Sequence, residues 1–179
     1  MTSDRLRAWY NIGDKSRKKG ETMYLVSPTK GRMTFEQMME DVMAYITGLP
    51  SSSYKIIIGS DSQVIRGQTC FITAVIVHRL GKGARYYYRR KMHRKVKSLR
   101  QKIFFETALS LELGGQVAKR FAELGHEDLK VEIHIDAGTH GETKELIREV
   151  VGMVTGSGFK AKIKPEAYGA SCVADRHTK

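Results

Sequence analysis

Runs of apolar residues along the chain predict a mixed α/β domain. Stretches in which apolar positions follow the period of a helix fall at residues 98–124 and 142–155. Shorter apolar runs, bounded by glycine and polar residues, predict five strands, at residues 54–61, 70–80, 84–90, 129–136 and 159–164. Short turns join the first three strands, which favours an antiparallel arrangement. A strand–helix–strand unit places its two strands parallel, so we expect a five-stranded mixed sheet flanked by helices.

The beginning of the chain lacks this periodicity. It is polar and basic, so we interpret residues 1–33 as a basic arm. The sequence Thr34-Phe-Glu-Gln37 is a capping-box pattern, which predicts the start of a helix that ends near Gly48. Residues 34–179 then form one α/β domain that includes this accessory helix. The apolar side of the helix consists of Met38, Met39, Val42, Met43 and Ile46.

Basic residues exceed acidic ones and are concentrated in one segment. The chain has 31 lysines and arginines against 19 acidic residues, which gives a formal net charge of +12. Between Lys82 and Lys102 there is no acidic residue, and tyrosines are interleaved. Cations beside rings that can stack on bases indicate a nucleic-acid surface, although a merely basic surface would have the same composition. The residues expected to contact nucleic acid are Arg85, Arg89, Arg90, Lys91, Arg94, Lys95, Lys97 and Arg100.

The cysteines and the apolar runs bear on the compartment. Cys70 and Cys172 lie far apart and form no CxxC pair, which favours a reducing compartment and argues against a zinc site. No apolar stretch approaches the roughly 18 residues of a membrane span, and the N-terminus lacks the apolar core of a signal peptide. We therefore expect a cytoplasmic protein that has no membrane contact.

Two predicted strands end in an aspartate, at Asp61 and at Asp136. Open α/β sheets bind ligands outside the carboxyl ends of their parallel strands, where both side chains would lie. Two neighbouring carboxylates repel each other unless a cation neutralises them, and hard cations take oxygen ligands. The pair therefore indicates a Mg²⁺ or Mn²⁺ site. The alternative is that each aspartate only caps a turn or a helix.

A third carboxylate lies on the predicted helix at residues 98–124. Glu106 is centred on the apolar stripe that must face the sheet, so we expect it to be buried and to need a partner. A metal shared with the two aspartates would serve, as would an ion pair with Lys102 one turn earlier. Asp175, near the C-terminus, is a fourth candidate. The histidines that could move protons or contact phosphate are His134, His140 and His177.

These residues carry a resemblance to a known family. The order of elements and the placement of the acidic residues resemble the ribonuclease H-like superfamily. More closely, the segments Ile58-Gly-Ser-Asp-Ser-Gln63, Phe104-Phe-Glu-Thr-Ala-Leu-Ser-Leu-Glu112, His134-Ile-Asp-Ala-Gly-Thr139 and Ser171-Cys-Val-Ala-Asp-Arg176 resemble the YkuK-like family of bacterial proteins. The resemblance covers residues 34–179 and implies a ribonuclease H-like fold, but it supplies no proven activity.

The resemblance also implies a set of site residues. By analogy with ribonuclease H enzymes, Asp61, Glu106, Asp136 and Asp175 would hold two Mg²⁺ ions, and His177 or His140 would assist. Asp175 lies only four residues from the C-terminus, so a site of three carboxylates remains open.

The expected function is divalent-metal-dependent hydrolysis of phosphodiester bonds in RNA, an RNA–DNA hybrid or structured DNA. The first alternative is a nucleic-acid-binding module that kept the fold but lost turnover. A second is phosphoryl transfer on a nucleotide, because Asp136-Ala-Gly-Thr139 resembles the phosphate loops of actin-like ATPases. Those enzymes need two such domains around a cleft. The sequence does not predict the oligomeric state.

Overall fold

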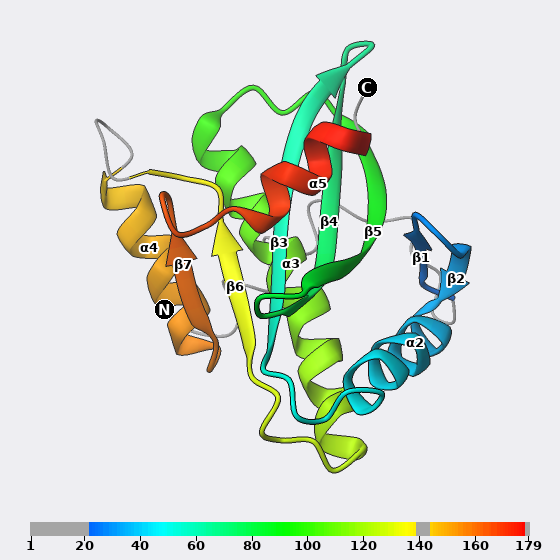
Figure 1. Ribbon diagram of the computed structural model, residues 1–179. Coiled ribbons are helices and arrows are strands. Elements are labelled where there is room, and N and C mark those ends of the chain that lie inside the picture. The colour runs from blue at the N-terminus through cyan, green and yellow to red at the C-terminus, as the bar shows by residue number, and fades with distance from the viewer. Residues whose placement is uncertain (1–21, 139–143, 178–179) are drawn as a thin grey trace.

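One seven-stranded mixed sheet forms the centre of the protein, in the order β2-β1-β5-β4-β3-β6-β7 (Figure 1). The computed structural model describes residues 22–138 and 144–177. The strands are β1 (Tyr24–Ser27), β2 (Gly31–Thr34), β3 (Tyr54–Ile65), β4 (Gln68–Arg79), β5 (Gly83–Arg94), β6 (Val131–Ile135) and β7 (Lys160–Ile163). The neighbours β3–β4 and β4–β5 are antiparallel, whereas β3–β6 and β6–β7 are parallel. The predicted mixed sheet is confirmed.

The expected number of five strands is wrong, because β1 and β2 add a hairpin at one edge of the sheet. This hairpin lies in the segment that the sequence analysis assigned to the basic arm. Each of its strands has only four residues, too few to display a clear alternation. Tertiary contacts hold it instead. Val26 pairs with Tyr88 of β5, and Leu25 and Met33 are buried in the core.

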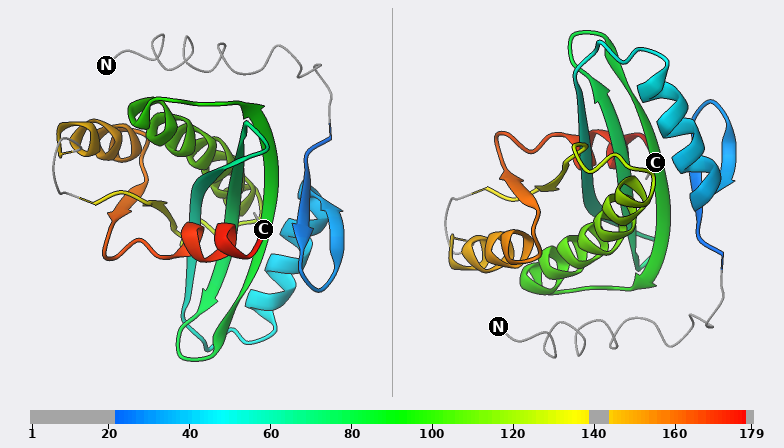
Figure 2. Two further views of the ribbon diagram at one scale, coloured as in Figure 1. Left: turned by 90° about the horizontal axis from the view of Figure 1, so that it is seen from above. Right: turned by 90° about the horizontal axis from the view of Figure 1, so that it is seen from below.

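Helices cover both faces of the sheet (Figure 2). On one face, α3 (Leu99–Glu123) and α4 (Lys144–Gly156) share the main core with α2 (Phe35–Thr47), which lies beside the hairpin. On the other face, α5 (Gly169–His177) covers a smaller apolar cluster on β3 and β4. Alternation along β4 supplies both cores, since Val75 and Val77 join the first and Ile72 and Ile76 join the second. None of the helices in the described ranges is long and apolar enough to cross a membrane.

The helix starts predicted at Thr34 and Ser98 are confirmed by their capping geometry, whereas the start predicted at residue 142 lies outside the described residues. The Thr34 side chain accepts a hydrogen bond from the Gln37 amide, and the Gln37 side chain accepts one from the Thr34 amide. Ser98 caps α3 by accepting from the Gln101 amide. The helix runs unbroken through Gly114, where an added Cβ would lie 2.9 Å from Ile133 Cδ1. This glycine therefore allows α3 to approach β6 closely.

A buried carboxylate joins the hairpin region to the rest of the sheet. Asp41 on α2 is 8% exposed and accepts hydrogen bonds from three donors. Lys30 Nζ lies 2.6 Å and Arg85 Nη1 3.0 Å from its Oδ1, and the Tyr87 hydroxyl lies 2.6 Å from its Oδ2. These donors come from the hairpin turn and from β5. Asp41 therefore links the hairpin, α2 and the sheet through one charge.

Substitution of Asp41 by asparagine should destabilise the protein. Its donors would lose the charge they share, and we expect the free energy of unfolding to fall by about 2–4 kcal/mol at neutral pH. Burial raises the pKa of Asp41, but Lys30, Tyr87 and Arg85 together lower it below its ordinary 3.8. A depressed folded-state pKa means that this stabilisation is present above pH 3.8 and is lost as the pH falls through the lower folded value.

Urea unfolding of the wild type and Asp41→Asn should therefore differ at neutral pH and converge in strong acid. Asp128→Asn serves as the control, because Asp128 is exposed in the turn after α3. It should shift stability by less than about 0.5 kcal/mol. A difference for Asp41→Asn that stays constant down to strong acid would contradict the assigned role of the ionised carboxylate.

Candidate functional site

The site is positioned by the point at which β6 stops pairing with β3. The last parallel pair is Ser60 of β3 with Ile135 of β6. Asp61 directly follows the first of these residues, and Asp136 directly follows the second. Both aspartates lie at the carboxyl end of the parallel pair, as expected. The predicted end of the strand at residue 61 is wrong, however. The hairpin with β4 carries β3 on to Ile65, because Gln63 and its neighbours still have antiparallel partners.

Alternation along β3 sends neighbouring side chains to opposite faces of the sheet. Ser62 points to α3, where its hydroxyl donates to Glu106 Oε1 at 2.7 Å. Gln63 shares a face with Asp61 and donates from Nε2 to Asp175 Oδ1 of α5 at 3.4 Å. The candidate carboxylates therefore approach the end of β3 from both layers of helices. Glu106 is 6% exposed, which confirms the burial predicted from its place on the helix stripe.

Two lysines lie among these carboxylates. Lys102 Nζ is 3.9 Å from Asp61 Oδ1 and 3.7 Å from Glu106 Oε1. Lys164 Nζ is 2.7 Å from Asp136 Oδ1. The ion pair of Lys102 with Glu106, which the sequence left open as an alternative to metal binding, is therefore present. Lys102 also reaches the carboxylate of a different element.

Burial and the charges of neighbouring carboxylates make Glu106 and Asp61 resist ionisation. Burial raises the pKa of Glu106 to about 8, Lys102 and Ser62 oppose the rise, and the charges of Asp61 and Asp136 add to it. Burial also raises the pKa of Asp61, and the charges of Asp136 and Asp175 contribute to that rise. Asp61 is therefore coupled to the charges of Asp136 and Asp175, and Glu106 to those of Asp61 and Asp136. Such a cluster favours a cation that neutralises it.

The chemistry of this cluster fits a hard divalent cation, because all of its candidate ligands are carboxylate oxygens. Within residues 22–138 and 144–177, however, no three His, Cys, Asp or Glu side chains are close enough together to hold a metal ion. The side chains lie on two faces of the sheet, and lysines lie between them. The four predicted ligands are thus neighbours in the fold and do not form a closed coordination group.

Comparisons with known proteins identify the family to which the chain belongs. The model of the family described as ribonuclease H-like matches residues 37–179. The chain is also 40% identical over 167 residues to the uncharacterized protein YkuK of Bacillus subtilis (strain 168). The aligned region covers 84% of this chain and 94% of that protein. The chain is a YkuK-like member of the ribonuclease H-like family. No solved structure matches it significantly.

The predicted histidines of this family member take different positions. The His177 ring stacks on Tyr88 at 4.0 Å and shares a hydrogen bond of 3.0 Å with the Tyr86 hydroxyl. Burial and the nearby Arg90 and Arg176 lower the pKa of His177. His134 is buried, and burial lowers its pKa as well. His140 and the other residues from 139 to 143 lie outside the described residues.

The predicted basic surface is divided between the two faces of the sheet. On the face of α3, Arg85 pairs with Asp41, and Arg89 pairs with Glu112 at 2.8 Å. On the face of α5, Arg90 donates to the His177 carbonyl. Arg100 pairs with Glu149 at 2.7 Å, and Lys91 is half-buried. The residues of the set that are exposed and whose side chains form neither an ion pair nor a hydrogen bond with the described part of the chain are Arg94, Lys95 and Lys97.

Three residues that contact the carboxylates were not predicted from the sequence: Ser62, Gln63 and Lys164. A usable signal existed for Lys164, because it follows β7 just as Asp136 follows β6, and β6 and β7 are parallel. The same strand-end rule that found the aspartates would have found this lysine. Ser62 and Gln63 lie beside Asp61 in a polar run that, by its sequence alone, predicts the end of the strand.

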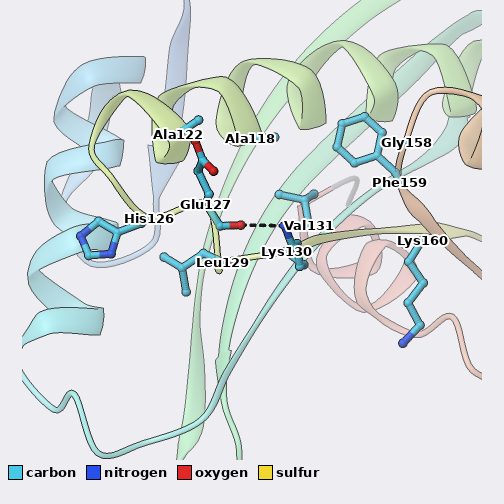
Figure 3. Close-up of a pocket in the computed structure, with 10 residues that line it drawn as sticks. All are labelled: Ala118, Ala122, His126, Glu127, Leu129, Lys130, Val131, Gly158, Phe159 and Lys160. Carbon is cyan, nitrogen blue, oxygen red and sulfur yellow. Dashed lines mark hydrogen bonds between the residues drawn. The ribbon is translucent and has the colours of Figure 1, made fainter.

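A separate hollow of about 490 Å³ lies at the opposite end of β6 (Figure 3). Its lining includes Phe159, Lys130 and Lys160. Lys130 Nζ donates to the Glu127 carbonyl at 2.7 Å, and Lys160 Nζ pairs with Glu132 at 3.0 Å. Both cations therefore have partners within the protein. The hollow contains none of the candidate carboxylates.

Replacement of Glu106 by glutamine should stabilise the metal-free protein at high pH. Between pH 4.5 and about 8 the unfolded chain releases the Glu106 proton while the folded protein retains it. The free energy of unfolding then falls by about 1.4 kcal/mol per pH unit. Glutamine does not titrate, so the gain should be largest near pH 8 and should vanish near pH 4.5.

The measurement is urea unfolding in EDTA across this pH range. Glu127→Gln is the matched control, because Glu127 is exposed and should give no pH-dependent difference. If Glu106→Gln shifted stability equally at both ends of the range, Glu106 would not hold its proton in the folded protein.

Proposed function

We propose that this protein is a divalent-metal-dependent nuclease that hydrolyses phosphodiester bonds in RNA, an RNA–DNA hybrid or structured DNA. The observation that carries the proposal is the coupling of Asp61, Glu106 and Asp136 at the carboxyl end of the parallel strands. Membership of the ribonuclease H-like family supports a nuclease or nucleic-acid-binding role. The net charge of +12 supports a polyanionic partner.

In this proposal Asp61, Glu106 and Asp136 hold Mg²⁺ or Mn²⁺, and Asp175 is the fourth ligand. A bound divalent cation at such a site would lower the pKa of water and stabilise charge on the leaving oxygen. Ser62 orients Glu106 through its 2.7 Å hydrogen bond, and Gln63 orients Asp175. His177 is the proposed auxiliary residue.

The basic residues serve to bind the nucleic-acid backbone. Arg94, Lys95 and Lys97 follow directly from β5 and precede α3, whose first turns carry Lys102 and Glu106. These exposed cations, which would bind phosphates, therefore lie close in sequence to Lys102 and Glu106. We also propose a cytoplasmic location, which is consistent with two free cysteines, Cys70 and Cys172.

A second candidate function is a nucleic-acid-binding module without turnover. The observation that favours it is the pairing of Lys102 and Lys164 with carboxylates that a nuclease would use for metal. Such a protein would bind nucleic acid in EDTA as well as in Mn²⁺. It would cut none of its ligands.

Cleavage by the wild type should require a divalent cation and should be lost in Asp61→Asn. Asparagine removes one ligand charge at nearly constant volume, so we expect the rate to fall by about 100-fold or more. The measurement uses labelled single-stranded RNA, RNA–DNA hybrid and branched DNA with Mn²⁺, Mg²⁺ or EDTA. The exposed Asp128→Asn variant should cut like the wild type. Gel shifts without cleavage in any metal would support the binding module instead.

Combined alanine substitution of Arg94, Lys95 and Lys97 should weaken binding to all nucleic acids. Each lost phosphate contact should lower the slope of log Kd against log salt by about 0.7–0.9. Fluorescence anisotropy in EDTA measures this without cleavage. Lys119→Ala is the control, because its side chain is 79% exposed near the far end of α3. An unchanged salt slope in the triple variant would remove these residues from the proposed surface.

A further inference from the structure

Lys102 lies between two carboxylates that belong to different layers of the fold. Its ammonium group is 3.9 Å from Asp61 Oδ1 and 3.7 Å from Glu106 Oε1. Both distances exceed those of ordinary charge-assisted hydrogen bonds, which are about 2.7–2.9 Å. Lys102 therefore faces both carboxyl groups without binding either of them tightly.

The three groups also differ in how freely they can move. The Asp61 and Glu106 side chains are 14% and 8% exposed, whereas Lys102 is 37% exposed. The Ser62 hydroxyl fixes Glu106, and the Ser62 amide donates to Asp61 Oδ1 at 2.7 Å. Lys102 instead has a flexible four-carbon stem that can turn to solvent. The carboxylates are fixed, and the cation between them can leave.

Lys164 stands in a similar relation to Asp136. Its side chain is 52% exposed, whereas that of Asp136 is 14% exposed. Lys164 follows β7, and Lys102 lies in the first turns of α3, so the two lysines reach the cluster from different elements. The cluster is therefore neutralised from two directions by side chains that have access to solvent.

We infer that Lys102 and Lys164 are the internal counter-ions of this carboxylate cluster, and that a divalent cation binds by displacing them. This inference rests on the proposed metal site, and it adds that the two lysines set the affinity of that site. The divalent cation and the ammonium of Lys102 compete for the same oxygens of Asp61 and Glu106. Removal of the lysine charge removes both the competitor and its repulsion of the incoming cation.

The inference predicts that Lys102→Met binds Mn²⁺ more tightly than the wild type. We expect a Kd for Mn²⁺ lower by about tenfold or more, because a unit charge within 4 Å of the site is lost. The measurement is titration of the full chain with Mn²⁺ alone, followed by isothermal calorimetry or by the electron paramagnetic resonance signal of free Mn²⁺. Lys102→Arg keeps the charge and should retain the wild-type Kd within about threefold. Lys119→Met, far along α3, should do the same.

A second readout follows the same exchange without substrate. In EDTA, Lys102→Met leaves the Asp61 carboxylate without the ammonium group that faces it, so its melting temperature should be lower than that of the wild type. Saturating Mn²⁺ should raise the melting temperature of Lys102→Met more than that of the wild type. If Lys102→Met does not fold in EDTA, Lys164→Met provides the same Mn²⁺ titration, because the Lys164 side chain is half-exposed.

The outcomes separate this inference from the proposed function. If the wild type binds Mn²⁺ and the methionine variants bind it equally or more weakly, the lysines are not displaced counter-ions and the inference fails alone. If neither the wild type nor any variant binds Mn²⁺, the proposed metal site fails and the inference fails with it. Tighter binding by Lys102→Met, together with wild-type affinity in Lys102→Arg, supports the inference.

Discussion

The pairing of β3 with two different neighbours is the constraint on which the site depends. β3 runs antiparallel to β4 along its whole length, but it is parallel to β6 only from Ile56 to Ser60. Beyond Ser60, β3 therefore continues while the chain after Ile135 turns away. Asp61 and Asp136 come together at this divergence, as ligand-binding residues do at the carboxyl ends of strands in open α/β sheets.

The carboxyl groups at this end of the sheet are costly to bury, and the protein compensates with hydrogen-bond and ion-pair partners. A buried carboxylate requires a partner, and Glu106 has the Ser62 hydroxyl and the Lys102 ammonium. Burial nevertheless raises the pKa of Glu106 to about 8. An apolar residue at this position on the α3 stripe would pack against β3 without these demands. The presence of glutamate there is an unfavourable local choice of the kind that functional sites tolerate.

Ion-pair and ring contacts also organise the outer parts of the fold. Asp41 connects the β1–β2 hairpin to β5 through Lys30 and Tyr87, and α5 is held against β5 by the stack of His177 on Tyr88. These contacts use side chains from the basic segment for structure. The arginines of that segment are therefore not a uniform nucleic-acid surface, and the exposed cations are concentrated where β5 leads into α3.

The sequence by itself determined the elements that depend on local periodicity and capping. The mixed order of the long strands, the helix starts at Thr34 and Ser98, and the burial of Glu106 follow from alternation, cap chemistry and the helical repeat. The short hairpin strands could not be predicted, because four residues carry too little pattern and Val26 is held by β5. Tertiary structure alone decided which strand end faces which lysine. Lys102 meets Asp61 because α3 packs against β3, and the packing of a helix against a particular strand is a long-range choice that no local pattern encodes.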